Sequence, residues 1–242
     1  MSRIVSKWIF VSLLLVAAGL PVLAQNSTKR NDRPQPAASP TPQLVEAVKK
    51  TTVASRYTYE FKQPQFIVNH ILIEHDAAGK GQITFERRSE ETPIVEPIEL
   101  SDTALKRIFG LWDSLRFLDS DENYQSSKNF AHLGTHSLGM DDGKRHRVAE
   151  LNWSNNKDAW SLVNEYRRVG DQAILIFNLK LARDMQPLNV PTLLNEMESL
   201  LSRDGLSDPR QLVPLLTDLR TDEHIPLIAR NQSDRILKKI NK

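Results

Sequence analysis

The chain has 242 residues, with 32 Lys and Arg residues against 30 Asp and Glu residues, and it has no cysteine. The lack of cysteine excludes disulfides, thiolate metal sites and a cysteine nucleophile, so that a packed core must stabilise the fold. Arg3 and Lys7 lie in the leading segment and account for the small excess of basic residues. The remainder is neutral, which gives no support for nucleic-acid binding, because that requires a concentrated basic face.

The first 24 residues have the three parts of an export signal. A short basic start (MSRIVSK) is followed by an apolar run (WIFVSLLLVAAGL) and a small-residue exit (PVLA), with cleavage expected before Gln25. Gly19 and Pro21 keep the apolar run shorter than the roughly 20 residues that a spanning helix needs. We therefore predict an exported, periplasmic or extracellular protein with no membrane segment after cleavage of residues 1–24. An uncleaved membrane anchor is the alternative interpretation.

The chain downstream of the signal is predicted to have three parts. Residues 25–43 are rich in Pro, Ser, Asn and charge, which predicts a disordered linker. Residues 44–155 are expected to form an α+β sheet domain, which begins with a short helical stretch from Leu44 to Lys50. Residues 156–242 are expected to form a helical segment that packs on or beside that domain. The predicted fold class is therefore α+β, an antiparallel sheet with a packed helix and an α-helical C-terminal segment.

The sheet domain is predicted from alternating and β-branched sequences. Tyr57, Tyr59 and Phe61 alternate with polar residues, which is typical of a half-buried strand. FIVNHILIEH and QITFERR give two further strands around a turn at AAGKG. Residues 93–100 form an edge strand, because Pro97 cannot donate to a ladder. Ser101 then caps a helix whose apolar face packs on the sheet; this face consists of Leu105, Ile108, Phe109, Trp112 and Leu115.

Residues 132–146 (HLGTHSLGMDDGKRH) bring potential metal ligands together, and His132, His136 and His146 are the candidate ligands. Asp142-Gly143 predicts a two-residue hairpin turn. The pairing expected from that turn sets Met140 opposite Arg145, Leu138 opposite Arg147, His136 opposite Ala149 and His146 opposite Gly139. His136 then lies on the apolar face and His146 on the other, which does not suit one metal ion. Gly134 argues against the helix that would unite His132 with His136. We therefore predict a hairpin without metal.

The second half of the chain has helical spacing. Residues 158–185 carry apolar and aromatic residues every three or four positions, with a break or kink expected at Gly170. A helix follows with Pro191 at its start and Gly205 just beyond its end. Two further helices are expected on either side of a turn at residues 220–223, the first with a kink or a late start at Pro214. His70 and His75, five residues apart on one strand, are expected to face opposite ways.

DPRQLVPLLTDLRTDEHIPLIARNQSDRILKKI resembles one unit of a HEAT-type helical repeat, two antiparallel helices with a leucine-rich inner face. The strands and helices from about Tyr57 to Arg168 are similar to small exported bacterial domains without an assigned function. The HEAT resemblance implies a binding scaffold. The apolar residues of this segment exceed one core-facing stripe, so we expect an interaction surface there, with Leu219 and Leu227 facing outward.

No nucleophile elbow, zinc-helix motif, phosphate loop or dinucleotide fingerprint is present in the sequence. We therefore predict an exported, non-enzymatic interaction or scaffold protein of the bacterial cell envelope, without cofactor, with another envelope protein as its partner and no nucleic acid. The alternatives are an exported hydrolase whose site assembles on folding, and a small-ligand carrier with a pocket between sheet and helices.

Overall fold

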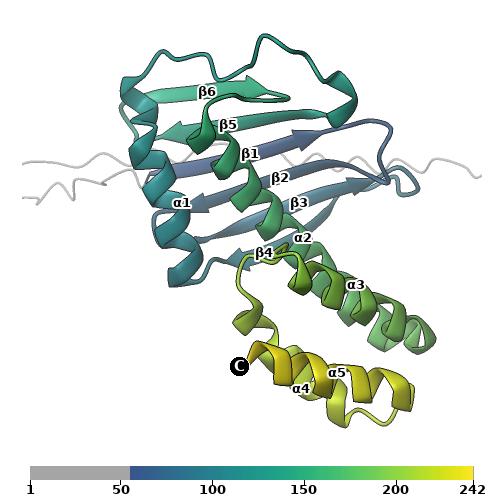
Figure 1. Ribbon diagram of the computed structural model, residues 1–242. Coiled ribbons are helices and arrows are strands. Elements are labelled where there is room, and N and C mark those ends of the chain that lie inside the picture. The colour runs from purple at the N-terminus through teal and green to yellow at the C-terminus, as the bar shows by residue number, and fades with distance from the viewer. Residues whose placement is uncertain (1–54, 242) are drawn as a thin grey trace, which may run out of the picture. The chain divides into compact units, whose positions relative to one another are not determined.

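The computed structural model describes residues 55–241, which form an antiparallel sheet followed by a helical segment, as the predicted α+β class requires (Figure 1). The strands are β1 (Arg56–Lys62), β2 (Val68–Asp76), β3 (Lys80–Arg87), β4 (Ile94–Glu99), β5 (Thr135–Asp141) and β6 (His146–Leu151). The α-helices are α1 (Asp102–Ser114), α2 (Lys157–Met185), α3 (Val190–Ser202), α4 (Val213–Thr221) and α5 (Leu227–Ile240). The predicted signal at 1–24, linker at 25–43 and helical stretch at 44–50 lie outside the described residues.

The described strands form one sheet with the order β4-β3-β2-β1-β5-β6. The alternation that predicted β1, β2 and β3 is confirmed, since Tyr59, Ile73 and Ile83 lie side by side on one face and are at most 1% exposed. The predicted edge strand is confirmed as β4. An edge position suits Pro97, which has no N–H for a second neighbour.

The hairpin of β5 and β6 is confirmed, but its predicted register is wrong by two residues. His136 pairs with Leu151, Leu138 with Ala149, Met140 with Arg147 and Asp141 with His146. The reason is that the turn lies one residue later than expected. The Asp142 N–H donates to the backbone oxygen of Arg145 at 3.1 Å, so Gly143 and Lys144 lie between the paired residues, and the Asp142 carboxylate accepts from the backbone N–H groups of Lys144 and Arg145. Because the shift is even, every side chain stays on its predicted face.

The helix α1 begins where the sequence predicts. The Ser101 hydroxyl oxygen accepts a hydrogen bond from the backbone N–H of Ala104 at 3.2 Å. Ile108 and Trp112 are buried against the sheet, and α1 and α2 lie beside each other on the same sheet face (Figure 1). This arrangement forms the first hydrophobic core, between the sheet, α1 and the first half of α2.

The helix α2 is continuous over 29 residues, so the break expected at Gly170 is wrong. Gly170 is buried over β2, and a Cβ atom at this position would lie in ordinary contact, at 3.8 Å, with Ile71 and Ile73. Packing on the sheet therefore offsets the helix-propensity cost of glycine, about 1 kcal/mol. Beyond Gly170 the helix runs past the sheet, where Leu175 and Leu179 enter a second hydrophobic core shared with α3, α4 and α5.

The helical segment consists of two consecutive antiparallel pairs, α2 with α3 and α4 with α5, and α3 packs on α5 (Figure 1). Pro191 lies in the first turn of α3, and Gly205 follows its end, as predicted, although the left-handed residue there is Asp204, with φ of 55°. Pro214 marks a late start, since α4 begins at Val213 after a short 3-10 turn at Pro209–Leu212.

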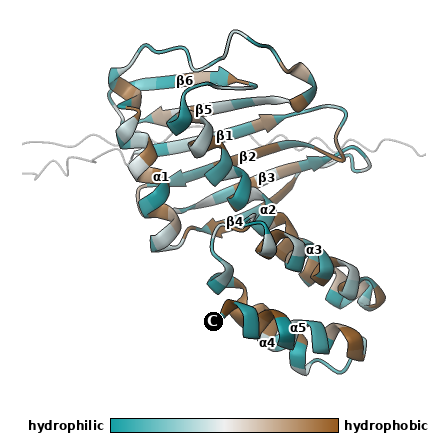
Figure 2. Ribbon diagram, viewed as in Figure 1, coloured by the Kyte–Doolittle hydropathy of each residue, from teal (hydrophilic) through white to brown (hydrophobic). Residues whose placement is uncertain are grey.

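One of the two leucines expected to face outward does not. Leu219 is 0% exposed, because it lies one turn after Leu216 on the side of α4 that packs in the second core. Leu227 is 62% exposed at the start of α5, as predicted. The apolar start of α5 is visible in Figure 2. Between residues 55 and 241, no helix combines the length and the apolar composition needed to cross a bilayer.

Candidate functional site

The structure separates the three candidate histidines. His132 is exposed in a 3-10 turn at Ala131–Leu133, and His146 is exposed at the start of β6. His136 is 2% exposed on the sheet face that the helices cover. Within the described part of the chain, no three His, Cys, Asp or Glu side chains are grouped closely enough to hold a metal ion.

The imidazole of His136 accepts or donates one hydrogen bond in the core, at 3.0 Å between its Nδ1 and the Tyr59 hydroxyl oxygen. Burial lowers the pKa of His136 to about 4, and the positive charge of Arg167 adds to that effect. Burial also raises the pKa of the Tyr59 hydroxyl. Both groups are therefore neutral near pH 7 and act as a polar pair inside the first core.

His75 has a fixed tautomer, because each of its ring nitrogens has a different partner. Nδ1 donates to the backbone oxygen of Asp76 at 2.8 Å, so Nε2 accepts from the Tyr166 hydroxyl at 2.8 Å. The same hydroxyl oxygen accepts from Trp112 Nε1 at 3.1 Å. Burial lowers the pKa of His75, and this neutral chain of hydrogen bonds joins β2, α1 and α2. His70 faces the opposite side of β2, as predicted, with its ring nitrogens beside Glu60 and Glu86.

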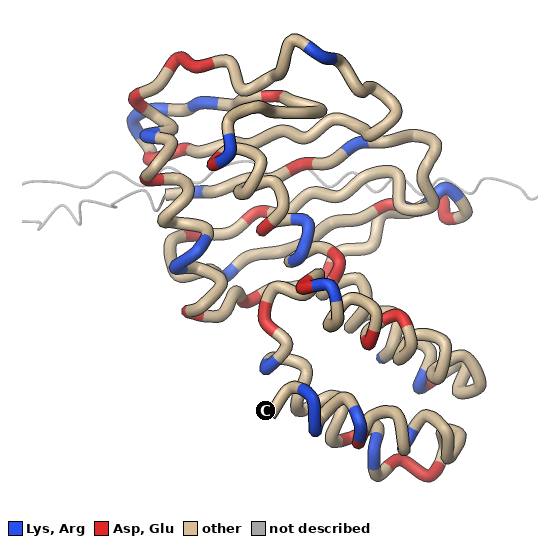
Figure 3. The backbone as a smooth tube through the Cα atoms, in the orientation of Figure 1, with Lys and Arg blue, Asp and Glu red and all other residues tan. Residues whose placement is uncertain are grey.

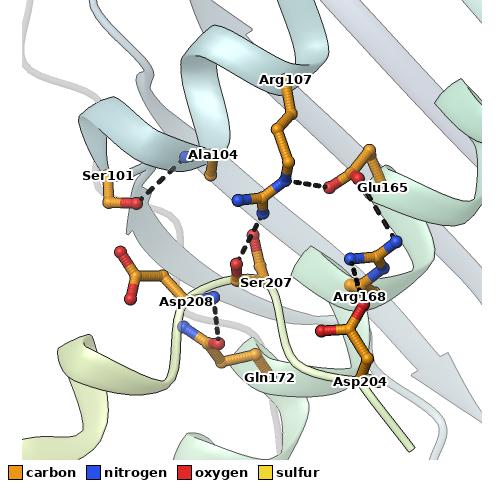
Figure 4. A network of polar contacts seen from close by, with 9 residues as sticks. All are labelled: Ser101, Ala104, Arg107, Glu165, Arg168, Gln172, Asp204, Ser207 and Asp208. Carbon is orange, nitrogen blue, oxygen red and sulfur yellow. Dashed lines mark hydrogen bonds and ion pairs between the residues drawn. The ribbon is translucent and has the colours of Figure 1, made fainter.

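A second polar network joins the sheet domain to the helical segment (Figure 4). Arg107 of α1 donates to the buried carboxylate of Glu165 at 3.0 Å and to the backbone oxygen of Ser207 at 2.6 Å. Arg168 lies 3.3 Å from the other Glu165 oxygen. The two guanidinium groups thus neutralise the charge of one buried carboxylate. Because Arg107 also binds the Ser207 backbone, the network holds the loop between α3 and α4 against α1 and α2.

That loop closes one end of a groove along α2, and the groove is the candidate functional site. Its inner part is a cleft of about 240 Å³ between β4, α2 and residues 207–211, and its outer part is a cleft of about 560 Å³ between α2 and α4. Both parts are lined by Ile176, Lys180 and Gln211, so they adjoin each other along α2. From Val169 to Asp184, the α2 wall is about 22 Å long at 1.5 Å per residue. We call this feature the α2–α4 groove.

The α2–α4 groove combines an apolar floor with an acidic rim. Phe177, Ile98 and Leu100 line the inner part, and Leu215 and Pro214 the outer part. Of its charged residues, Glu96, Asp184 and Asp218 are acidic, and Lys180 and Arg183 are basic. Glu99 also borders the inner part, but its side chain lies on the opposite sheet face from Glu96. Arg183 is already paired, with its Nε 2.6 Å from a carboxylate oxygen of Asp222, outside the lining. Elsewhere in the described chain charges of both signs are interspersed (Figure 3).

The β4 edge beside the groove is unsuited to the addition of another strand. Leu100 donates to Gly79, so the alternate residues Val95, Pro97 and Glu99 direct their backbone groups away from β3. Pro97 has no N–H to donate, and the Glu99 backbone oxygen already accepts from Gln211 Nε2 at 2.9 Å. Pro and side-chain capping are devices that protect sheet edges. Backbone pairing along this edge is therefore disfavoured, and the groove presents mainly side chains.

The sequence missed this groove, because its walls come from β4, α2 and α4, which are distant in the chain. The helical spacing predicted α2 and α4 but carries no signal for how far apart they lie. The ion pair of Arg107 and Glu165 could not be predicted from the sequence either, because the two residues are 58 positions apart.

No protein-family model matches the chain, and no curated protein is significantly similar to it in sequence. The resemblance to a HEAT-type unit and to small exported domains therefore remains a prediction.

Proposed function

We propose that the protein is an exported, non-enzymatic interaction protein of the bacterial cell envelope, and that it holds a partner envelope protein in the α2–α4 groove. The observation that carries the proposal is that the two clefts adjoin along α2, which gives an elongated surface lined by both apolar and charged side chains. Such a combination is common in binding grooves between helices. The basic start, apolar run and small-residue exit of residues 1–24 support export.

The test places a photo-crosslinking amino acid in the groove. In the full-length chain, p-benzoylphenylalanine replaces Leu215 of α4, which lines the outer part of the groove. The matched control replaces Val148 of β6, which is 52% exposed outside the groove. Each protein is irradiated in an envelope extract of the producing bacterium, and adducts are identified by mass spectrometry.

The proposal expects one discrete protein adduct from position 215 and none of the same mass from position 148. The same adducts from both positions, or no protein adduct at position 215, would contradict it. A fluorescent small molecule or lipid crosslinked at position 215 would favour the ligand-carrier alternative instead.

A further inference from the structure

We infer that the segment bound in the α2–α4 groove is a short basic peptide that places one aliphatic or aromatic side chain in the inner cleft. This inference rests on the proposed function and adds the chemical class of the bound segment. Charge complementarity carries it, since the described lining has three acidic side chains, Glu96, Asp184 and Asp218, against two basic ones, and Arg183 is already paired with Asp222.

The acidic residues of the outer cleft are available for such a partner. Asp184 and Asp218 are exposed and belong to α2 and α4, on opposite walls. Lysine or arginine side chains of a bound segment can approach both of them from solvent, where each ion pair contributes modestly and favours fast association. Asp222 differs from them, because its carboxylate is bound to Arg183 and to the backbone N–H of His224, and these hydrogen bonds lower its pKa to about 2.

The inner cleft fits one side chain better than a whole metabolite. Its volume of about 240 Å³ is below the low end of typical small-molecule sites, about 300 Å³. Its apolar wall is formed by Ile98, Ala173 and Phe177, whereas Gln211 and Ser207 form a polar end. A buried apolar anchor with charges around it is the usual energetic pattern of an interface.

The length of the groove limits the bound segment. Its α2 wall of about 22 Å accommodates about seven extended residues or about four turns of helix. The blunted β4 edge disfavours pairing of backbone with backbone at the inner end. Recognition is therefore expected to depend on side-chain charge and on one anchor, with little dependence on a defined strand register.

The experiment selects binders of the full-length protein from a displayed library of random peptides, followed by fluorescence-polarisation titration of the enriched sequences. The tested variant carries Asp184→Lys and Asp218→Lys. The matched control carries Glu91→Lys and Asp121→Lys, which make the same change in net charge at exposed positions outside the groove. Circular dichroism checks that both variants remain folded.

The expected result is enrichment of peptides with Lys or Arg next to a large apolar residue. Their affinity should fall about tenfold in the groove variant and stay within about twofold in the control. Acidic or uncharged consensus sequences that still require the groove would overturn the inference and leave the proposed function standing. Basic peptides that bind both variants equally would show that simple net charge attracts them, which also overturns it. Failure to enrich any peptide would count against both proposals.

Discussion

At the scale of single residues, His136 makes the stability of the protein depend on pH. Its folded pKa of about 4 lies below the value of about 6.5 expected in the unfolded chain. Between these values, the unfolded chain binds a proton that the folded chain excludes, so stability falls as the pH decreases from 6.5 to 4. The full loss is on the order of 3 kcal/mol, at 1.36 kcal/mol per pKa unit.

The variant His136→Gln tests this account, because glutamine keeps a hydrogen-bonding group near Tyr59 but has no proton to gain. Urea unfolding gives the free energy of unfolding at pH 7 and at pH 4.5. The decrease in this free energy between the two pH values should be about 2 kcal/mol smaller in the variant than in the wild type. This pH range lies above the titration of Asp142 and Asp222, whose hydrogen bonds lower their pKa values to about 2. An equal decrease in both proteins would show that His136 is not the group responsible for the pH dependence.

Ser207 gives a second prediction at this scale. Its hydroxyl is buried and has no hydrogen-bond partner among the described residues, whereas its backbone oxygen is bound by Arg107. A buried polar group without a partner costs about 1–3 kcal/mol, so Ser207→Ala should leave the free energy of unfolding unchanged or raise it. The control Ser101→Ala removes a helix cap and should lower it by about 1 kcal/mol. Destabilisation of Ser207→Ala beyond that of the control would show that the hydroxyl has a partner.

At the scale of secondary-structure elements, the sequence was most informative where a local pattern alone determines the element and its buried face. The alternation in β1 and the cap at Ser101 both appear as predicted. The register of β5 and β6 was wrong, because the hydrogen bonds of one side chain, Asp142, determine the loop. The side chains of both strands still lie on the predicted sheet faces, because only a register shift by an odd number of residues would exchange the two faces.

The pattern of α4 was less informative, because its leucines are too many for a simple stripe. Leu219 was expected to face outward, yet it is buried with Leu212 and Leu216 in the second core. A periodicity predicts that a face is apolar, but which neighbour covers it depends on helices elsewhere in the chain. The α2–α4 groove could not be predicted for the same reason.

The difference in burial between Leu219 and Leu227 predicts a measurable difference in the effect of their substitution on stability. Leu219→Ala should reduce the free energy of unfolding by about 2–5 kcal/mol, as expected for a buried leucine. Leu227→Ala, at a residue that is 62% exposed, should change it by less than about 0.5 kcal/mol. Thermal and urea unfolding followed by circular dichroism will check both. A small effect at Leu219 would mean that the second core does not pack as described.

At the scale of the whole molecule, export is a separate prediction. The leading segment predicts removal of residues 1–24, so that the mature chain begins at Gln25. Intact-mass measurement of protein recovered from the bacterial envelope should give the mass of residues 25–242. Recovery of the uncleaved chain in the membrane fraction would support the anchor alternative. This outcome is independent of the groove, which lies between β4 and α4.

The fold joins a sheet to a small helical scaffold through a single long helix. The first half of α2 covers the sheet, its second half lines the groove, and the Arg107–Glu165 pair fixes the loop that closes the inner end. If the groove binds a partner as proposed, its walls are preformed by these contacts, and preformed sites lower the entropic cost of binding. We propose that the protein binds its partner in this groove.

Hydrogen–deuterium exchange tests that claim most directly, with the full-length chain compared alone and in the presence of a saturating selected peptide. The account predicts slower exchange in residues 173–184 of α2 and 213–218 of α4, with unchanged exchange in β5 and β6. Protection confined to the sheet, or to the exposed start of α5 around Leu227, with α2 and α4 unaffected, would contradict it.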